Sequence, residues 1–257
     1  MSKPPVFYYL IQVRFNRMTQ MNQYVPAFQE AMRSLGFADY NEEAQLEVVW
    51  QQAPGAQPGI QEHHKKRWLF NDMDRTSGFV LLDDALVYHT TAYHSYAQCK
   101  ESLESALQQL HQIVGLNFIQ RIGMRYLDCI EADTFAGLGE SVHAGVLGVA
   151  GVMPGELRQG FSETVTTLDD TALVLKSMVS QGALRLPPDL QGLSLVLPET
   201  LRQVNQPWVL MDTDCYIEKR FTFELQPVTE QLDKLHTQLL DLFKSCVTEQ
   251  AKQKWQL

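Results

Sequence analysis

The chain has 257 residues, of which 45% are hydrophobic and 20% are charged. This composition is typical of a globular protein with its own core, and it excludes the disordered, collagen-like and disulfide-scaffold classes. Acidic residues outnumber basic ones by 30 to 21, so the net charge is −9. Sequence-independent nucleic-acid binding needs an excess of Lys and Arg to neutralise phosphates, so we expect no nucleic-acid partner.

The first part of the chain is predicted to hold five strands and a helix. Residues 6–15 are rich in aromatic and β-branched side chains, which predicts a buried strand. Pro26 and Gly36 mark the start and the end of a helix over 22–35. Four further strands, the last three forming an antiparallel meander after a Pro- and Gly-rich loop at 51–59, are expected at 46–50, 67–70, 78–82 and 86–93.

A second helix is predicted over 96–114, because apolar residues recur there every three or four positions. A long strand is expected at 118–130. The glycine-rich segment 135–155 fits either a broken helix or a packed loop. A last helix is expected over 228–247, and the polar tail after it is expected to fray. The remaining strands are expected at 161–168, 172–179, 193–197, 208–217 and 221–225.

Two short matches indicate an internal repeat. Residues 79–83 resemble residues 208–212, and residues 13–15 resemble residues 124–126. The first match extends without a gap into the two long predicted helices. Generic amphipathic patterning is the alternative explanation of both matches. An internal repeat matters because it would set the architecture of the whole chain.

We therefore expect an α+β fold of two pseudo-repeated halves. Each half is predicted to be an antiparallel sheet backed by a long helix, with one core shared between them. The halves are expected to span 1–117 and 118–257 and to pack tightly, with a single domain as the alternative. Runs of consecutive strands argue against a doubly wound parallel sheet, in which strands and helices would alternate.

The cysteines and the amino terminus indicate a cytoplasmic protein. None of the four cysteines forms a C-x-x-C pair or a zinc-site spacing, so reduced thiols are expected. The apolar run at 6–13 is short and lacks a small-residue cleavage site, so it does not resemble a signal peptide. No stretch reaches the roughly 18 apolar residues of a membrane span, and no membrane partner is expected.

No catalytic signature stands out in the sequence. A phosphate loop, a complete dinucleotide fingerprint, a nucleophile elbow and an H-E-x-x-H motif are all missing. We expect no cofactor, no metal and no catalytic residue. Three pairs of aspartates invite an acid–base interpretation, but each stands between strand-like runs, which favours tight turns. These pairs are Asp83 with Asp84, Asp169 with Asp170, and Asp212 with Asp214.

Two arginines give the best candidate for a polar site. Arg121 and Arg125 share one face of the predicted strand at 118–130. If that face is buried, both guanidinium groups need carboxylate partners, for which Asp212 or Glu218 is available. A structural ion pair is favoured, with a ligand-binding arginine as the alternative. The candidate cluster, structural or ligand-binding, consists of Arg121, Arg125, Asp128 and Asp212.

Residues 122–128 read Ile-Gly-Met-Arg-Tyr-Leu-Asp. They resemble the motif of a family of sporadically distributed prokaryotic proteins of uncharacterised function, which reads Ile-Gly-x-Arg-Tyr-x-Asn. This chain departs from the motif at Asp128. An opening strand with Arg14 and Phe15, and a threonine close to a tryptophan near the end, Thr248 and Trp255, also resemble that family. The resemblance implies no catalytic residue, and sporadic distribution is typical of defence, toxin and immunity genes.

These features favour a non-enzymatic protein that binds another protein in the bacterial cytoplasm. The sharper hypothesis is an immunity protein that neutralises a cognate toxin by direct binding, since an acidic surface speeds capture of a basic partner. One alternative is a small-ligand-binding protein or an enzyme with a site between the two halves. Another alternative is a scaffold or regulatory subunit, and a homodimer is compatible with each hypothesis.

Overall fold

The computed structural model describes residues 5–51, 59–155 and 157–256, and side chains outside 45–65. Nine strands in these ranges form one sheet, in the order β2-β3-β4-β5-β1-β6-β9-β8-β7, and every neighbouring pair is antiparallel. The strands are β1 (Val6–Phe15), β2 (Asp39–Gln51), β3 (Gly59–Asn71), β4 (Ser77–Leu81), β5 (Ala85–Thr90), β6 (Phe118–Glu131), β7 (Gln159–Leu168), β8 (Thr171–Gln181) and β9 (Pro207–Thr222). The fold class is therefore α+β, as predicted.

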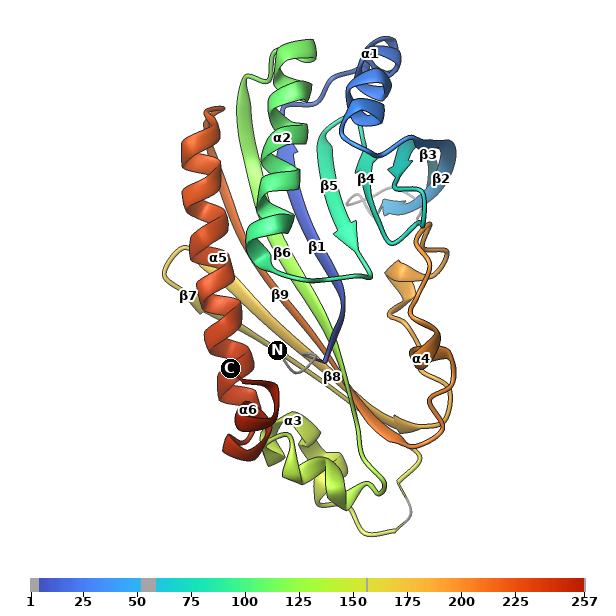
Figure 1. The fold of residues 1–257 in the computed structure, drawn as a ribbon, viewed down its shortest axis with the longest axis vertical. Coiled ribbons are helices and arrows are strands. Elements are labelled where there is room, and N and C mark those ends of the chain that lie inside the picture. The colour runs from blue at the N-terminus through green and yellow to red at the C-terminus, as the bar shows by residue number, and fades with distance from the viewer. Residues whose placement is uncertain (1–4, 52–58, 156, 257) are drawn as a thin grey trace.

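Three long helices lie on one face of the sheet (Figure 1): α1 (Met21–Ser34), α2 (Tyr96–Val114) and α5 (Leu225–Cys246). We call this the helix-covered face and the opposite one the open face. The short helical segments are η1 (Ala136–Glu140), α3 (Ala144–Leu147), η2 (Gly148–Gly151), η3 (Pro188–Leu190), α4 (Glu199–Arg202) and α6 (Glu249–Trp255). None of the helices in the described ranges is long and apolar enough to cross a membrane.

Strand β1 shows how the sequence divides the two faces. Its side chains alternate, so Tyr9, Ile11 and Val13 point into the main core and are fully buried under the helices. Gln12 and Arg14 point to the open face, where they contact other polar side chains. The main core draws residues from all three long helices and from strands on both sides of β1.

The two expected halves meet inside the sheet. β1 and β6, the first strand of each half, pair along nearly their whole length at its centre. β5 and β9, the strands before the two long helices α2 and α5, lie on either side of them. One continuous sheet therefore crosses the predicted boundary between residues 117 and 118.

Several predicted elements agree closely with the structure. The helix expected over 96–114 is α2, which ends at Gly115 with a positive φ of 66°, a left-handed conformation that glycine adopts without strain. The strand expected at 118–130 is β6, one residue longer. Asp83 with Asp84 and Asp169 with Asp170 lie in turns between strands, as expected.

Other predictions are wrong. Residues 193–197 form no strand, and 208–217 and 221–225 do not form two strands, because β9 runs unbroken from Pro207 to Thr222. Asp212 and Asp214 are therefore within a strand and not in a turn. The tail does not fray as expected: it forms α6, whose Trp255 is buried in a second core cluster.

The glycine-rich segment 135–155, expected as a broken helix or a packed loop, is a series of short helical turns packed on the core. It holds the short turns η1, α3 and η2, and Leu138 and Val146 pack into the second core cluster. The strand expected at 46–50 lies inside the longer β2. The loop expected at 51–59 falls mostly outside the described residues.

The candidate binding surface on the open face

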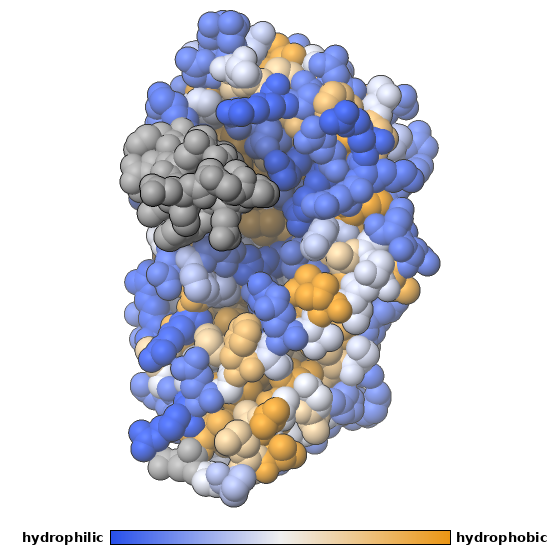
Figure 2. Space-filling view, turned by 180° about the vertical axis from the view of Figure 1, so that it is seen from behind, coloured by the Kyte–Doolittle hydropathy of each residue, from blue (hydrophilic) through white to orange (hydrophobic). Residues whose placement is uncertain are grey.

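A strip of polar side chains crosses the open face from β1 to β8 (Figure 2). Hydrophilic residues gather over the upper and middle part of this face, and hydrophobic residues are more frequent below. The strip is built by strand alternation on neighbouring strands of the sheet, in the order β1, β6, β9 and β8. Its main members are Gln12, Arg14, Arg121, Arg125, Lys176, Asp212, Asp214, Tyr216 and Glu218.

Arg125 and Asp212 form a nearly buried ion pair within this strip. The guanidinium group donates two parallel hydrogen bonds, both 2.7 Å long, to the two carboxylate oxygens. The side chains are only 14% and 7% exposed. A third member, Asp189 of η3, accepts from the same guanidinium and is 61% exposed. This bidentate geometry is the strongest form of a charge-assisted hydrogen bond.

The electrostatics of Arg125 reflect these contacts. Burial alone would lower the pKa of Arg125, but the hydrogen bonds that it donates to Asp212 and Asp189 outweigh burial and hold that pKa above its usual value. The pKa of Asp189 is lowered, because its contacts with Arg125 outweigh its own burial. Arg125 thus stays charged at every relevant pH, and Asp212 is the predicted carboxylate partner.

Arg121 has no single main partner and instead contacts side chains of the two neighbouring strands. Its guanidinium donates to Gln12 at 2.8 Å and lies over the ring of Tyr216, 4.3 Å from the centroid. The nearest carboxylates are Glu218 at 3.8 Å and Asp214 at 4.0 Å. Burial raises the pKa of Asp214 above its usual range in spite of nearby Arg121 and Arg125.

Gly123 leaves the space that Arg121 occupies. A Cβ atom at Gly123 would stand 2.8 Å from the nearest guanidinium nitrogen of Arg121. Gly123 pairs with Gln12 and Tyr216, the two residues on which that guanidinium rests. The glycine of the Ile-Gly-x-Arg-Tyr pattern therefore has a physical role here: it lets an arginine lie flat across the sheet.

Asp128 does not join the predicted cluster. It lies three positions beyond Arg125 on β6, so strand alternation places it on the helix-covered face. Asp128 is 4% exposed and makes no hydrogen bond or ion pair with the rest of the described chain. Burial raises its pKa to about 8. The structure thus brings Arg121, Arg125 and Asp212 together and leaves Asp128 on the other side of the sheet.

Sequence reasoning missed the polar contacts beneath the long helices. The hydroxyl of Tyr126 lies 2.9 Å from Nδ1 of His236 on α5, and the His236 ring stacks on Tyr96 of α2 at 3.9 Å between centroids. Tyr96 in turn donates to Asp233 at 2.6 Å. These contacts join α2, α5 and β6. The spacing of Asp233 and His236 on one helical face was the only signal in the sequence.

A pocket of about 380 Å³ opens at the β7 end of the polar strip. We call it the acidic pocket, because its lining has four carboxylates against two cations. They are Glu163, Asp189, Asp212, Asp214, Arg125 and Lys176. Val165 and Val174 supply apolar wall. With its negative charges in surplus, the pocket suits a cationic group.

The comparisons with known proteins add no relative. No protein-family model matches the chain, and no curated protein or solved structure matches it either. Among the described residues, no group of three His, Cys, Asp or Glu side chains is arranged to hold a metal ion.

Proposed function

We propose that this chain is a non-enzymatic binding protein that captures a basic protein partner on its open face, at the acidic pocket and strand β7. The observation that supports this most directly is the surface next to the pocket. Phe161 and Val165 of β7 are 63% and 59% exposed and stand on the same face as Glu163. An exposed aromatic residue beside a charged pocket is typical of protein interfaces.

Strand β7 also offers an unpaired edge. It ends the sheet, and β8 is its one neighbour among the described strands. From Glu163 to Leu168 every residue is exposed, and Leu168 is 49% exposed. The outer backbone groups of such a strand are available to pair with an extended segment of another protein. A partner strand laid along β7 would place alternate side chains against Phe161 and Val165.

Charge indicates which kind of partner fits. The chain has a net charge of −9, and the acidic pocket has two more carboxylates than cations. A Lys or Arg side chain of a partner laid along β7 would meet Glu163, whose side chain is 44% exposed and whose carboxylate lies 3.6 Å from Lys176. Complementary charge speeds encounter and suppresses wrong partners.

The resemblance to sporadically distributed prokaryotic proteins supports a sharper form of the proposal. In that form the partner is a basic bacterial toxin, and the chain is an immunity protein in the cytoplasm of the producing cell. Neutralisation by occlusion requires a complementary surface and no reactive group. The exposed β7 edge and the acidic pocket would provide that surface.

The two halves share an arrangement of strands and a long helix, and we propose that they are pseudo-repeats. Each half begins on a central strand, β1 or β6, and its last strand, β5 or β9, lies beside that central strand and leads into a long helix. The plan supports two related halves that differ in strand number.

Reversing one charge at the pocket tests the proposed surface. With the tagged full chain as bait in its native host, we expect one stoichiometric basic protein to be retained. Glu163→Lys should weaken its capture at least tenfold, because the new cation faces the partner's basic group. Glu101→Lys on α2 is the matched control: it makes the same charge change on the helix-covered side and should leave capture unchanged.

Growth assays then test the immunity form. Expression of the captured protein alone should stop growth, co-expression with the native chain should restore it, and Glu163→Lys should fail to restore it. Equal capture by the native chain and both variants would contradict the proposed surface. A captured protein that is not toxic would contradict the immunity form and leave the binding proposal in place.

A further inference from the structure

The register of the sheet determines which backbone groups of β7 point outward. In an antiparallel sheet, the N–H and C=O of one residue face one neighbouring strand and those of the next residue face the other. The N–H of Ala132 donates to the carbonyl oxygen of Pro207 at 3.0 Å, which sets this alternation between β6 and β9. From that pair the register continues through β9, β8 and β7 without a shift. The residues of β7 whose N–H and C=O point away from β8 are therefore Phe161, Glu163, Val165 and Thr167.

The same residues of β7 carry the side chains of the open face. Glu163 and Val165 line the acidic pocket, and Phe161 and Val165 are 63% and 59% exposed. Strand alternation places the side chains between them on the opposite face. These are the hydroxyl-bearing Ser162, Thr164 and Thr166. The edge thus presents an apolar, a hydroxyl, an acidic, a hydroxyl and an apolar side chain in succession.

Glu163 is available to a cation from a partner. It pairs with Lys176 of β8 at 3.6 Å, and the two side chains are 44% and 41% exposed. An exposed pair of this kind contributes little stability, so a second cation can share the carboxylate. Val165 lies directly opposite Val174 of β8, and both line the acidic pocket. An apolar side chain on an added strand would extend this apolar row.

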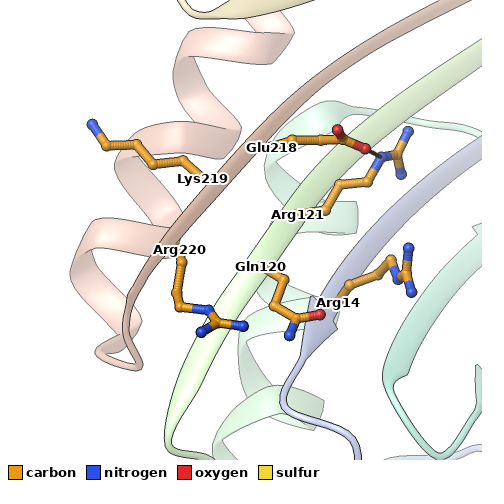
Figure 3. Close-up of a pocket in the computed structure, with 6 residues that line it drawn as sticks. All are labelled: Arg14, Gln120, Arg121, Glu218, Lys219 and Arg220. Carbon is orange, nitrogen blue, oxygen red and sulfur yellow. Dashed lines mark ion pairs between the residues drawn. The ribbon is translucent and has the colours of Figure 1, made fainter.

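The far side of the open face carries the opposite charge (Figure 3). A pocket of about 380 Å³ at β1, β6 and β9 is lined by four cations and one carboxylate. Its arginine side chains point apart. Arg14 pairs with Asp84 at 2.6 Å, and Arg220 lies over the ring of Phe118. These separate contacts define no common ligand, but their surplus positive charge repels a basic segment and favours its approach to β7.

We propose that β7 binds its partner by adding an antiparallel strand, and that this strand has the pattern apolar, hydroxyl, basic, hydroxyl, apolar. The inference rests on the proposed function and names the element of the partner that acts there. Each open-face residue of the added strand exchanges two backbone hydrogen bonds with β7. Its cation stands opposite Glu163, and its apolar residues stand opposite Phe161 and Val165. Opposite charges, aromatic with β-branched residues, and paired threonines are the favourable cross-strand neighbours.

A short labelled peptide tests the pattern. The peptide Thr-Thr-Val-Thr-Lys-Thr-Val, blocked at both ends, should bind the full chain saturably at one site per chain by fluorescence anisotropy. The matched control peptide exchanges the lysine with the threonine before it. That exchange keeps the composition but moves the cation to the face of the hydroxyl groups. We expect the control to bind at least tenfold more weakly.

Backbone methylation of the peptide separates strand addition from side-chain contact alone. N-methylation of the lysine removes an N–H that bonds to β7 and should weaken binding at least tenfold. N-methylation of the threonine before it alters an N–H that points away from β7 and should change the affinity less than threefold. Equal affinities of the two methylated peptides would overturn the proposal.

Two changes in the protein test the register. Glu163→Lys should lose the lysine peptide and bind a peptide with glutamate in its place at least fivefold more tightly than the native chain does. Val165→Pro removes an outward N–H and no bond to β8, so the edge strand should tolerate it, as judged by circular dichroism. It should weaken peptide binding at least tenfold, whereas Val165→Ala keeps the N–H and should cost less.

Failure of this inference and failure of the proposed function give different results. If capture of the basic partner requires Glu163 but is equally strong with Val165→Pro, the proposed surface stands and strand addition is wrong. If the peptides behave as expected but Glu163→Lys leaves capture of the partner unchanged, strand addition stands and the proposed function is wrong. Absence of saturable binding of the lysine peptide would overturn the inference directly.

Discussion

Asp128→Asn is expected to stabilise the protein at pH 8 and to leave its stability at pH 4 nearly unchanged. Asp128 is 4% exposed and has no cationic or hydrogen-bonding partner in the described chain. Burial alone raises the pKa of its carboxyl group to about 8. Ionising this group in the folded state is therefore unfavourable, whereas in the unfolded chain it ionises near its usual pKa. Asparagine has nearly the same shape and never ionises.

The sign of the effect follows from proton linkage. The folded state binds a proton that the unfolded state releases between about pH 4 and pH 8, so the stability of the native protein falls as pH rises through this window. The loss is complete above the folded-state pKa. The pKa rises from 3.8 to about 8. Each pKa unit corresponds to about 1.4 kcal/mol, so the loss is on the order of 5–6 kcal/mol. The asparagine variant removes it.

Urea unfolding at pH 4, 6 and 8 measures this difference. The gap between Asp128→Asn and the native chain should widen with pH, while Asp74→Asn, a matched change at an exposed aspartate, should show no gap. A variant less stable than the native chain at pH 8 would show that the fold stabilises the carboxylate.

Elements with a strong local pattern could be predicted from the sequence. Helix α2 was predicted to the residue, because its apolar face repeats over five turns and Gly115 provides a left-handed end. Strand β1 was equally clear, since a long run of aromatic and β-branched residues fits a buried strand in the middle of a sheet. These elements carry their own signal, and tertiary contacts only reinforce it.

The errors arose where a distant contact overrides local preference. Aspartate favours turns by its local hydrogen bonding. Asp212 nevertheless lies within a strand, where Arg125 on the neighbouring strand pairs with its carboxylate. The tail looked polar, yet Thr248 caps a helix by accepting from the backbone N–H of Ala251, and Ala251 and Trp255 bury one side of it. The polar strip on the open face depends on how neighbouring strands pair, and no local stretch of sequence determines that pairing.

Part of the candidate site, namely Arg121, Arg125 and Asp212, could be predicted from the sequence. Arg121 and Arg125 were placed on one face by alternation, and Asp212 was named as a partner for such arginines. The same alternation places Asp128 on the opposite face, and applying it to all four residues would have removed Asp128 from the cluster. The acidic pocket was out of reach, because it combines side chains from four strands whose order was unknown.

Asp212→Ala is expected to destabilise the protein by roughly 2–4 kcal/mol, because it leaves the guanidinium of Arg125 nearly buried with only Asp189 as a partner. Asp189→Ala removes the exposed member of the same group and should cost less than about 1 kcal/mol. Urea unfolding at pH 7 measures both. Equal losses for the two variants would contradict the view that Asp212 is the main partner.

A double variant then separates a structural from a ligand-binding role for Arg125. In Arg125→Met with Asp212→Leu, both charges leave together, and apolar side chains of similar size fill the space. If the pair is structural, this variant should regain most of the stability lost in Asp212→Ala and still capture the partner. If Arg125 contacts a ligand or the partner directly, stability should return while capture is lost, because packing replaces the ion pair in the fold and nothing replaces the guanidinium at the surface.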